Sequence, residues 1–171
     1  MVSPSPSDIK TMREDEDHNA EFFHLADTLL TAAGFDHYET SNYARSGHHS
    51  SHNRGYWRGE DYLGLGPSAV STLANIRHLN VADTDRYVAL VGSLGQAVVE
   101  SEPLTPEARR IERIALGLRT NEGIPLSLLD GGALERAASL ATEGLARITA
   151  DRLLLVHHGR ALVDPIAADL I

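Results

Sequence analysis

Residues 37–72, HYETSNYARSGHHSSHNRGYWRGEDYLGLGPSAVST, contain the densest polar cluster of the chain, at positions 47–53. The segment before this stretch, residues 17–33, carries apolar side chains at helical spacing. It is followed by Gly34, a residue typical of a helix C-terminus. Residues 35–44 have the composition of a strand, with Tyr38 and Tyr43 as β-favouring residues. A helix that leads directly into a strand is typical of an α/β layer. We therefore expect one helix–strand unit over residues 17–44.

The polar cluster supplies three imidazoles, His48, His49 and His52, followed by Asn53. Neutral imidazole is a ligand both for metal ions and for heme iron. The acidic residues that usually orient metal-binding histidines are not adjacent to these positions. We see no helical period over residues 45–61 and predict an ordered loop there. Three interpretations stay open: side chains that bond to the loop backbone, a contact with heme or substrate, and a dedicated metal site.

An aromatic pair beside an arginine, Tyr56, Trp57 and Arg58, follows the cluster. Such a group can line a planar ligand by stacking. It can equally close the end of a barrel by plain packing. Both interpretations place residues 56–58 next to the histidines, so we count them among the candidate heme or substrate contacts.

Gly64 and Gly66 belong to a glycine-rich segment inside an expected short buried strand, residues 62–72, that runs into a turn. The GxGxxG spacing of a dinucleotide-binding loop fails, because Ala69 stands where the third glycine belongs. Backbone amides freed from Cβ crowding could still approach a ligand closely. Tight turning is the alternative explanation of these glycines.

The composition excludes several functions. The 171 residues include no cysteine, so the chain cannot by itself hold a thiolate-ligated iron–sulfur or zinc centre, and a metal would need histidine, carboxylate or backbone ligands. The net charge is −9 and Lys10 is the single lysine, which argues against nucleic-acid binding. No apolar run approaches the roughly 18–20 residues of a membrane span, and no signal-peptide pattern opens the chain. We expect a soluble, cytoplasmic protein.

The remaining segments predict a flexible leader over residues 1–16 and a C-terminal domain over residues 101–171. Between them, a helix over residues 83–94 is expected to turn Tyr87, Leu90, Val91 and Leu94 inward. In the C-terminal domain, Thr105 and Pro106 are typical of a helix start. We expect a second helix over residues 133–148, a strand over 152–156, a turn over 157–159 and a last short helix from Pro165 with Asp164 as its cap. This order favours a small α+β module of winged-helix type.

Taken in order, the motifs resemble those of the radical S-adenosylmethionine (SAM) proteins related to oxygen-independent coproporphyrinogen III oxidase. The heme-chaperone branch, of HemW type, is the nearer one. The matching motifs are Tyr38-Glu39, Ser41-Asn42, Gly47-His48, His52-Asn53, Tyr56-Trp57-Arg58-Gly59 and Tyr62-Leu63-Gly64-Leu65-Gly66. A looser likeness covers the rest of residues 17–171. The sequence departs from the family pattern at Ser51, where arginine is usual, at Val70, where histidine is usual, and at Pro165 within the last helix.

The resemblance implies an α+β fold. Residues 17–100 would be the last helix and strand of a partial (β/α) radical-SAM barrel, followed by the winged-helix-like domain. It implies a 4Fe–4S cluster and SAM in the full-length family, held by a barrel portion upstream of this chain, which would be the partner of these residues. Heme or porphyrin would be the ligand. We assign no catalytic residue and no metal ligand. The candidate heme or substrate contacts are His48, His49, His52, Asn53, Tyr56, Trp57 and Arg58, and the candidate cofactor-binding residues are Asn42, Gly64 and Gly66.

Three hypotheses about function follow. The first is the C-terminal fragment of a radical-SAM protein of heme or porphyrin metabolism, inactive alone, whose full-length form is a heme chaperone or an oxidase. The second is a stand-alone heme- or porphyrin-binding module that uses residues 48–57. The third is a winged-helix interaction domain built from residues 105–171, which the acidity of the chain disfavours.

Overall fold

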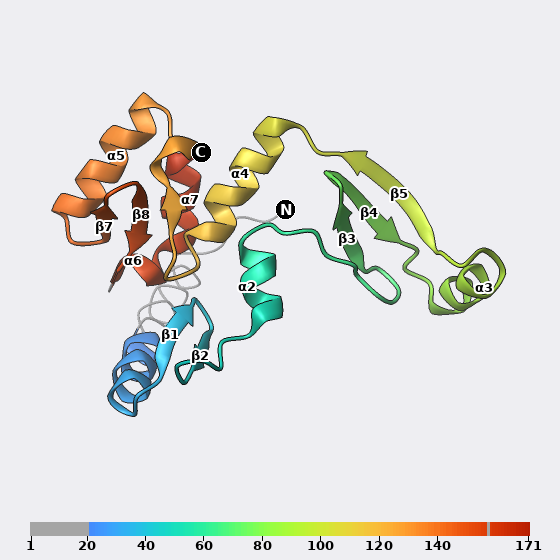
Figure 1. Ribbon diagram of the computed structural model, residues 1–171, viewed down its shortest axis with the longest axis horizontal. Coiled ribbons are helices and arrows are strands. Elements are labelled where there is room, and N and C mark those ends of the chain that lie inside the picture. The colour runs from blue at the N-terminus through green and yellow to red at the C-terminus, as the bar shows by residue number, and fades with distance from the viewer. Residues whose placement is uncertain (1–20, 157) are drawn as a thin grey trace, which may run out of the picture.

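The computed structural model describes residues 21–156 and 158–171, and the expected leader over residues 1–16 lies outside this range. The described chain has three parts: a helix–hairpin–helix segment, an extended arm and a C-terminal domain (Figure 1). All three sheets among the described residues are antiparallel. No helix in the described ranges is long and apolar enough to cross a membrane. The cytoplasmic location expected from the sequence stays a prediction.

The first part begins with a helix whose described portion covers residues 21–32, and Gly34, with φ of 82°, ends it as expected. The single strand expected over residues 35–44 is wrong: β1 (Asp36–Glu39) and β2 (Asn42–Ala44) form a hairpin. The chain reverses at residues 40–41, where the Thr40 amide donates to the carbonyl of Arg119 instead of continuing a strand. The helix–strand unit itself is present, since the first helix leads directly into β1.

The loop expected over residues 45–61 is also wrong in part, because α2 (Ser51–Trp57) lies inside it. Ser50 caps this helix: its hydroxyl accepts a hydrogen bond from the Asn53 amide at 3.2 Å. A serine at this position satisfies a backbone amide that the first helical turn leaves free. Because residues 51–57 form a helix, side chains four positions apart lie on the same side of it.

The arm consists of β3 (Val70–Leu73), β4 (Ile76–Asn80), α3 (Thr84–Leu94) and β5 (Val98–Pro103), with strand order β3-β4-β5. Ala74 and Asn75 both have positive φ, as the two-residue turn of a twisted hairpin requires. The strand expected over residues 62–72 is wrong except at its end, and Tyr62 only forms an isolated bridge with Thr72. The sheet extends to residue 103, past the boundary expected near residue 100.

Helix α3 confirms the expected helix over residues 83–94, with Asp83 as its cap. Its expected inward face is wrong in part. Tyr87 and Leu90 are half-buried, whereas Val91 is 39% and Leu94 68% exposed. The arm has a single layer of sheet and one helix, so it offers less apolar cover than a closed domain.

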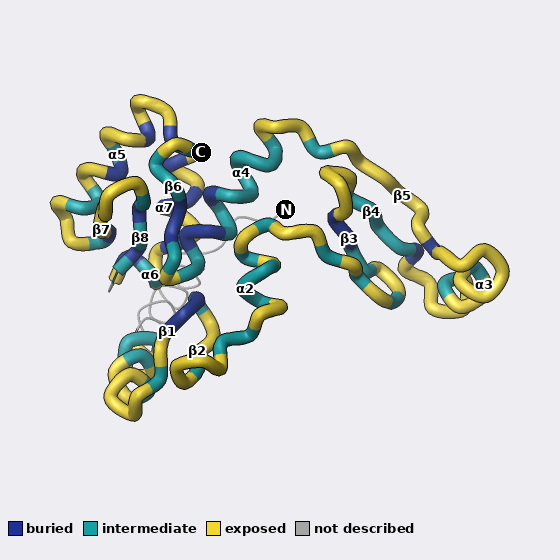
Figure 2. The backbone as a smooth tube through the Cα atoms, viewed as in Figure 1, coloured by how far each residue is buried: buried dark blue, intermediate teal, exposed yellow. Residues whose placement is uncertain are grey.

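The C-terminal domain comprises α4 (Pro106–Gly117), β6 (Ile124–Pro125), the 3₁₀ helix η1 (Leu126–Leu128), α5 (Gly131–Thr142), β7 (Ala146–Thr149), β8 (Arg152–Leu155), α6 (His158–Ala161) and α7 (Val163–Leu170). Its sheet has the order β6-β8-β7. The main apolar core lies here, between the sheet and α4, α5 and α7. Figure 2 shows buried segments concentrated in this domain. The largest fully buried side chains of the core are those of Ile114, Ile124, Leu153, Leu155 and Leu170.

Helix α4 begins as expected, with Thr105 as its cap and Pro106 in its first turn. The helix expected over residues 133–148 ends instead at Thr142, because Gly144 adopts φ of 73° and residues 146–149 pair with β8. The turn expected over residues 157–159 is wrong at its described positions, which lie in α6. The last helix begins at Val163, so Asp164 lies in its first turn and is not its cap.

Candidate functional site

Helix α2 divides the sequence-predicted contacts between two faces. His52 and Tyr56 are four residues apart, so they share one face of the helix. His52 is exposed, and Tyr56 is 41% exposed. Asn53 and Trp57 share the next face and are half-buried. The helix therefore presents one imidazole and one phenol ring to solvent, backed by a more buried amide and indole.

A buried carboxylate holds the inner face of α2. Glu39 is 2% exposed, and its Oε1 accepts hydrogen bonds from the side-chain amides of Asn42 and Asn53, the latter at 3.2 Å. Its Oε2 is buried without a partner in the described part of the chain. Asn42 and Asn53, both predicted as ligand contacts, therefore face Glu39. Sequence reasoning missed the role of Glu39, although Tyr38-Glu39 is one of the family motifs.

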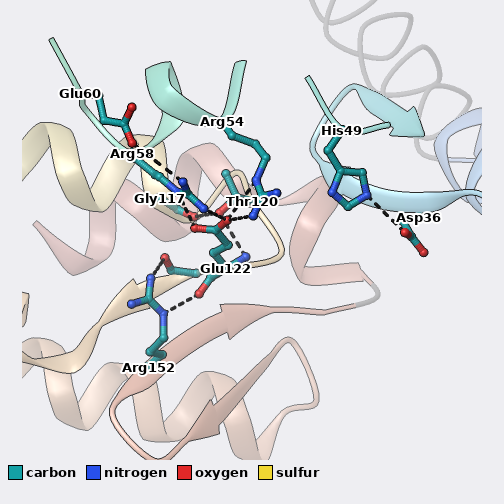
Figure 3. A network of polar contacts seen from close by, with 10 residues as sticks. Asp36, His49, Arg54, Arg58, Glu60, Gly117, Thr120, Glu122 and Arg152 are labelled. Carbon is teal, nitrogen blue, oxygen red and sulfur yellow. Dashed lines mark hydrogen bonds and ion pairs between the residues drawn. The ribbon is translucent and has the colours of Figure 1, made fainter. Parts of the chain in front are cut away.

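The three histidines of the polar cluster do not converge. His49 stacks on the Tyr38 ring, with centroids 4.6 Å apart, and its Nε2 lies 3.2 Å from Asp36 Oδ2 (Figure 3). His48 and His52 are exposed and have no side-chain partner among the described residues. No group of three histidine, aspartate or glutamate side chains that could hold a metal ion occurs in the described ranges. Within the polar cluster, His48 and His52 are thus the exposed imidazoles.

Arg58 contacts the C-terminal domain. Its Nε and Nη2 donate to the two carboxylate oxygens of Glu122, at 2.9 and 2.6 Å, and Arg54 donates to Oε1 of the same carboxylate (Figure 3). Arg152 in turn donates to the backbone carbonyls of Glu122 and Gly123. The hydrogen bond from Arg58, with help from Arg54, lowers the pKa of Glu122 to about 2. Arg58 therefore anchors α2, and Glu122 is a positioning residue that the sequence did not single out.

The aromatic rings around α2 pack edge to face. The Tyr56 ring lies 5.4 Å from the Trp57 ring and 5.4 Å from the Tyr62 ring, in centroid separations. Edge-to-face pairs of this kind stabilise a ring position and leave one ring face available. Tyr56 is thus held beside His52 in a defined orientation.

A second polar group lies between the first helix and the hairpin. The buried His37 stacks on Tyr43 with centroids 4.1 Å apart, and its Nδ1 lies 2.8 Å from Asp27 Oδ1. Arg160 donates to the His37 carbonyl at 3.0 Å. Burial lowers the pKa of His37, and burial together with Asp27 raises the pKa of Tyr43 to about 12. Both rings are therefore neutral near pH 7, and the group fastens the hairpin to the C-terminal domain.

Gly64 and Gly66 lie beside the arm, apart from α2 along the chain. The Gly64 amide donates to Ser71 Oγ at 3.0 Å, and the Gly66 amide donates to the Tyr87 hydroxyl at 3.1 Å. A Cβ at Gly64 would lie 2.1 Å from the Val70 carbonyl oxygen. Close packing against β3 accounts for Gly64, and both amides already have partners within the protein.

The residues of this chain do not fit a 4Fe–4S cluster. Such clusters are held by cysteine thiolates, and the sequence contains none. In the described ranges, histidine and carboxylate side chains do not gather into a substitute ligand set. On α2, the described residues present an exposed imidazole, His52, and a partly exposed phenol ring, Tyr56.

Comparison with known proteins identifies relatives of the chain. It is 35% identical to the heme chaperone HemW of Mycobacterium tuberculosis over 157 residues, which are 92% of this chain and 40% of that protein. It is 29% identical to HemW of Bacillus subtilis over 159 residues, covering 88% of this chain and 42% of that protein. The bovine (Bos taurus) mitochondrial radical S-adenosyl methionine domain-containing protein 1 is 29% identical over 176 residues, covering 92% of this chain and 40% of that protein.

Among solved structures, the coproporphyrinogen III oxidase HemN of Escherichia coli, a radical SAM enzyme, matches with a TM-score of 0.62 and 20% identity. The match covers 98% of this chain and 42% of that one, and at this identity it shows the fold alone. No protein-family model matches the sequence. The chain spans about 40% of the length of the curated relatives described above.

Proposed function

Because the chain is homologous to the C-terminal part of HemW heme chaperones and of related radical SAM proteins, we propose that it is the C-terminal portion of a radical SAM protein that handles heme. The full-length protein would bind and deliver heme, in preference to oxidising coproporphyrinogen. This portion would supply scaffold and one wall of the porphyrin site. Without thiolates it would not be catalytic alone.

The observation that carries the proposal is the arrangement of α2. Asn53 of α2 bonds to Glu39 of the hairpin. Arg54 of α2 and Arg58 at its C-terminus bond to Glu122, which fixes the helix to the C-terminal domain. The face with His52 and Tyr56 is left to solvent. An imidazole nitrogen can bind heme iron, and an adjacent phenol ring can pack on the edge or face of a porphyrin. A fixed helix with an accessible imidazole is suited to bind a large planar ligand and to release it again.

A hemin titration of the 171-residue chain tests the proposal. We expect hemin to give a shifted Soret band, and the change of His48, His49 and His52 together to Ala to weaken binding at this site by at least about tenfold. His52→Ala alone should have most of this effect, whereas His49→Ala should have little, because His49 is held by Tyr38 and Asp36. His158→Ala is the matched control. A triple variant that binds hemin as the wild type does would exclude the α2 face as the ligand.

A stand-alone heme module remains the alternative. The fragment proposal and the stand-alone module predict different gene sequences. The fragment proposal requires a cysteine-rich reading frame upstream of Met1 and continuous with it. A stop codon before Met1, with no such frame, would favour the stand-alone module. Hemin binding would be expected in both cases, so the titration tests the site and the upstream sequence tests the context.

We further propose that the C-terminal domain is of winged-helix type. Its order α4-β6-η1-α5-β7-β8, with β6 paired to β8 and β8 to β7, supports this assignment. The charge of −9 argues against a nucleic-acid partner, so we expect the domain to contact protein or porphyrin. A gel shift with DNA or RNA at low salt would contradict this expectation.

A further inference from the structure

The arm contains a hollow on the side of its sheet that faces α3. Its volume is about 560 Å³, within the about 300–1,000 Å³ typical of small-molecule sites. The hollow is open to solvent on one side. Its apolar lining comes from the segment before β3, from the sheet and from α3: Leu63, Leu65, Leu73, Tyr87, Val91 and Val98. Several of these side chains are substantially exposed, Leu63 by 66% and Leu65 by 81%.

One imidazole, that of His78 on β4, lies in this lining. His78 is opposite Ser101 of β5 in the sheet register, and His78 Nδ1 lies 2.8 Å from Ser101 Oγ. When Nδ1 carries the proton and donates to the hydroxyl, Nε2 keeps its lone pair. Nε2 has no partner among the described residues. Metal-binding histidines usually donate their second N–H to a carboxylate, a backbone carbonyl or water, and the Ser101 hydroxyl can orient His78 in a similar way.

Several other polar groups of the lining already form hydrogen bonds within the protein, whereas the Gln96 side chain lines the hollow as well. Ser71 and Tyr87 accept hydrogen bonds from the amides of Gly64 and Gly66, and Asn80 donates to the Gly66 carbonyl. None of the residues that line the hollow is charged. A hollow whose lining mixes apolar and neutral polar groups, with no acidic or basic side chain to pair with a phosphate, disfavours a phosphate-bearing ligand and suits a planar ring with both apolar and polar edges. The open side would let the carboxylates of such a ring stay in water.

We propose that this hollow is a second metalloporphyrin site, in which His78 Nε2 ligates the iron of heme. This second proposal takes its class of ligand, a metalloporphyrin, from the proposed function, but the residues of the hollow include none from α2. Figure 1 shows α2 and α3 on separate parts of the molecule, and no residue of α2 lines the hollow.

The test compares hemin with metal-free protoporphyrin IX as probes of the full 171-residue chain. His78→Gln keeps a polar side chain of similar size but lacks the imidazole. We expect it to remove one of two Soret components and to weaken hemin binding at that site by at least about tenfold. Binding of metal-free protoporphyrin IX should be unchanged by His78→Gln, because that probe has no iron. His158→Gln is the matched control and should change neither probe.

A second variant tests the hollow independently of the imidazole. Val91→Glu places a charge on an exposed position of α3 at the edge of the hollow, so it should weaken both probes while far-UV circular dichroism stays that of the wild type. If His78→Gln leaves the hemin spectrum and affinity unaltered, the second site is wrong.

The two proposals fail in different ways. If the His48/His49/His52 variant loses all hemin binding while His78→Gln binds hemin as the wild type does, the α2 face is supported and the second site is overturned. The reverse result supports the second site and overturns the α2 face. No binding of hemin to the wild-type chain overturns both.

Discussion

Arg58 and Glu122 lie 64 positions apart in the sequence, and their side chains form a two-point ion pair with N–O distances of 2.9 and 2.6 Å. Arg54 adds a further hydrogen bond from the preceding turn of α2. The pair joins α2 to the segment between α4 and β6. The helix that presents His52 and Tyr56 is therefore positioned by the C-terminal domain, which makes the stability of this contact relevant to ligand binding.

Glu122→Gln should lower the free energy of unfolding at pH 7 by about 1–2 kcal/mol, less than the full pKa shift implies, because Arg54 and Arg58 are partly exposed. The pKa of Glu122 is about 2 in the folded protein, against an ordinary 4.5. A lowered pKa stabilises the folded state above pH 4.5, and this contribution is lost as the pH falls toward 2. Urea unfolding of both proteins between pH 7 and 3 measures the difference.

Glu60→Gln is the control for this prediction. Glu60 also faces Arg58, but at 3.9 Å and with a side chain 60% exposed, so its removal should change little. A difference between wild type and Glu122→Gln that stayed constant down to pH 3 would show that the carboxylate charge is not what stabilises the contact.

Asn53→Ala should destabilise the protein by about 1–3 kcal/mol, because the buried Glu39 carboxylate loses one of its two amide donors. It should also speed hydrogen exchange of the α2 amides. His52→Ala, one residue away but exposed, should change stability by less than about 0.5 kcal/mol while it lowers hemin affinity. Equal loss of stability in the two variants would contradict this division of α2 into an anchored and a ligand-facing side.

Gly123→Ala should be among the most damaging single changes in the C-terminal domain. A Cβ at this position would lie 2.1 Å from the Leu153 carbonyl oxygen, and φ is +64°. Backbone strain and displacement of β8 should together cost more than about 2 kcal/mol. Gly92→Ala is the opposite case, since a Cβ inside α3 meets nothing within 4 Å and should stabilise by about 0.5–1 kcal/mol. Thermal melts of both variants measure these effects, and similar melting temperatures would refute the predicted contrast.

Leu153→Ala should destabilise by about 2–5 kcal/mol, because this β8 side chain is fully buried in the core. Leu65→Ala removes the same atoms from a side chain that is 81% exposed and should cost little stability. If the hollow of the arm binds porphyrin, however, Leu65→Ala should weaken that binding. Urea unfolding and the metal-free protoporphyrin titration separate the two effects.

Several residues that start or stop helices were predicted correctly from the sequence, because their effect depends on the few backbone groups next to them. The cap Thr105, the first-turn proline Pro106 and the stop at Gly34 all lie where expected, because each acts through its own backbone neighbours. The predictions failed where tertiary pairing competes with helical pattern. Leu145 and Ile148 continue the apolar spacing of α5, but residues 146–149 pair with β8 and form strand β7.

The candidate site shows the same division. The motifs His52-Asn53 and Tyr56-Trp57-Arg58 supplied the candidate residues, and the absence of cysteine excluded a thiolate-held cluster in this chain. Which of these candidate residues stays accessible to solvent was decided only by the fold. Asn53 and Arg58 turn to Glu39 and Glu122, partners 14 and 64 positions away, and His52 stays exposed. A charged or amide side chain takes whichever partner the fold brings near it, and contacts across such separations are not encoded in local spacing.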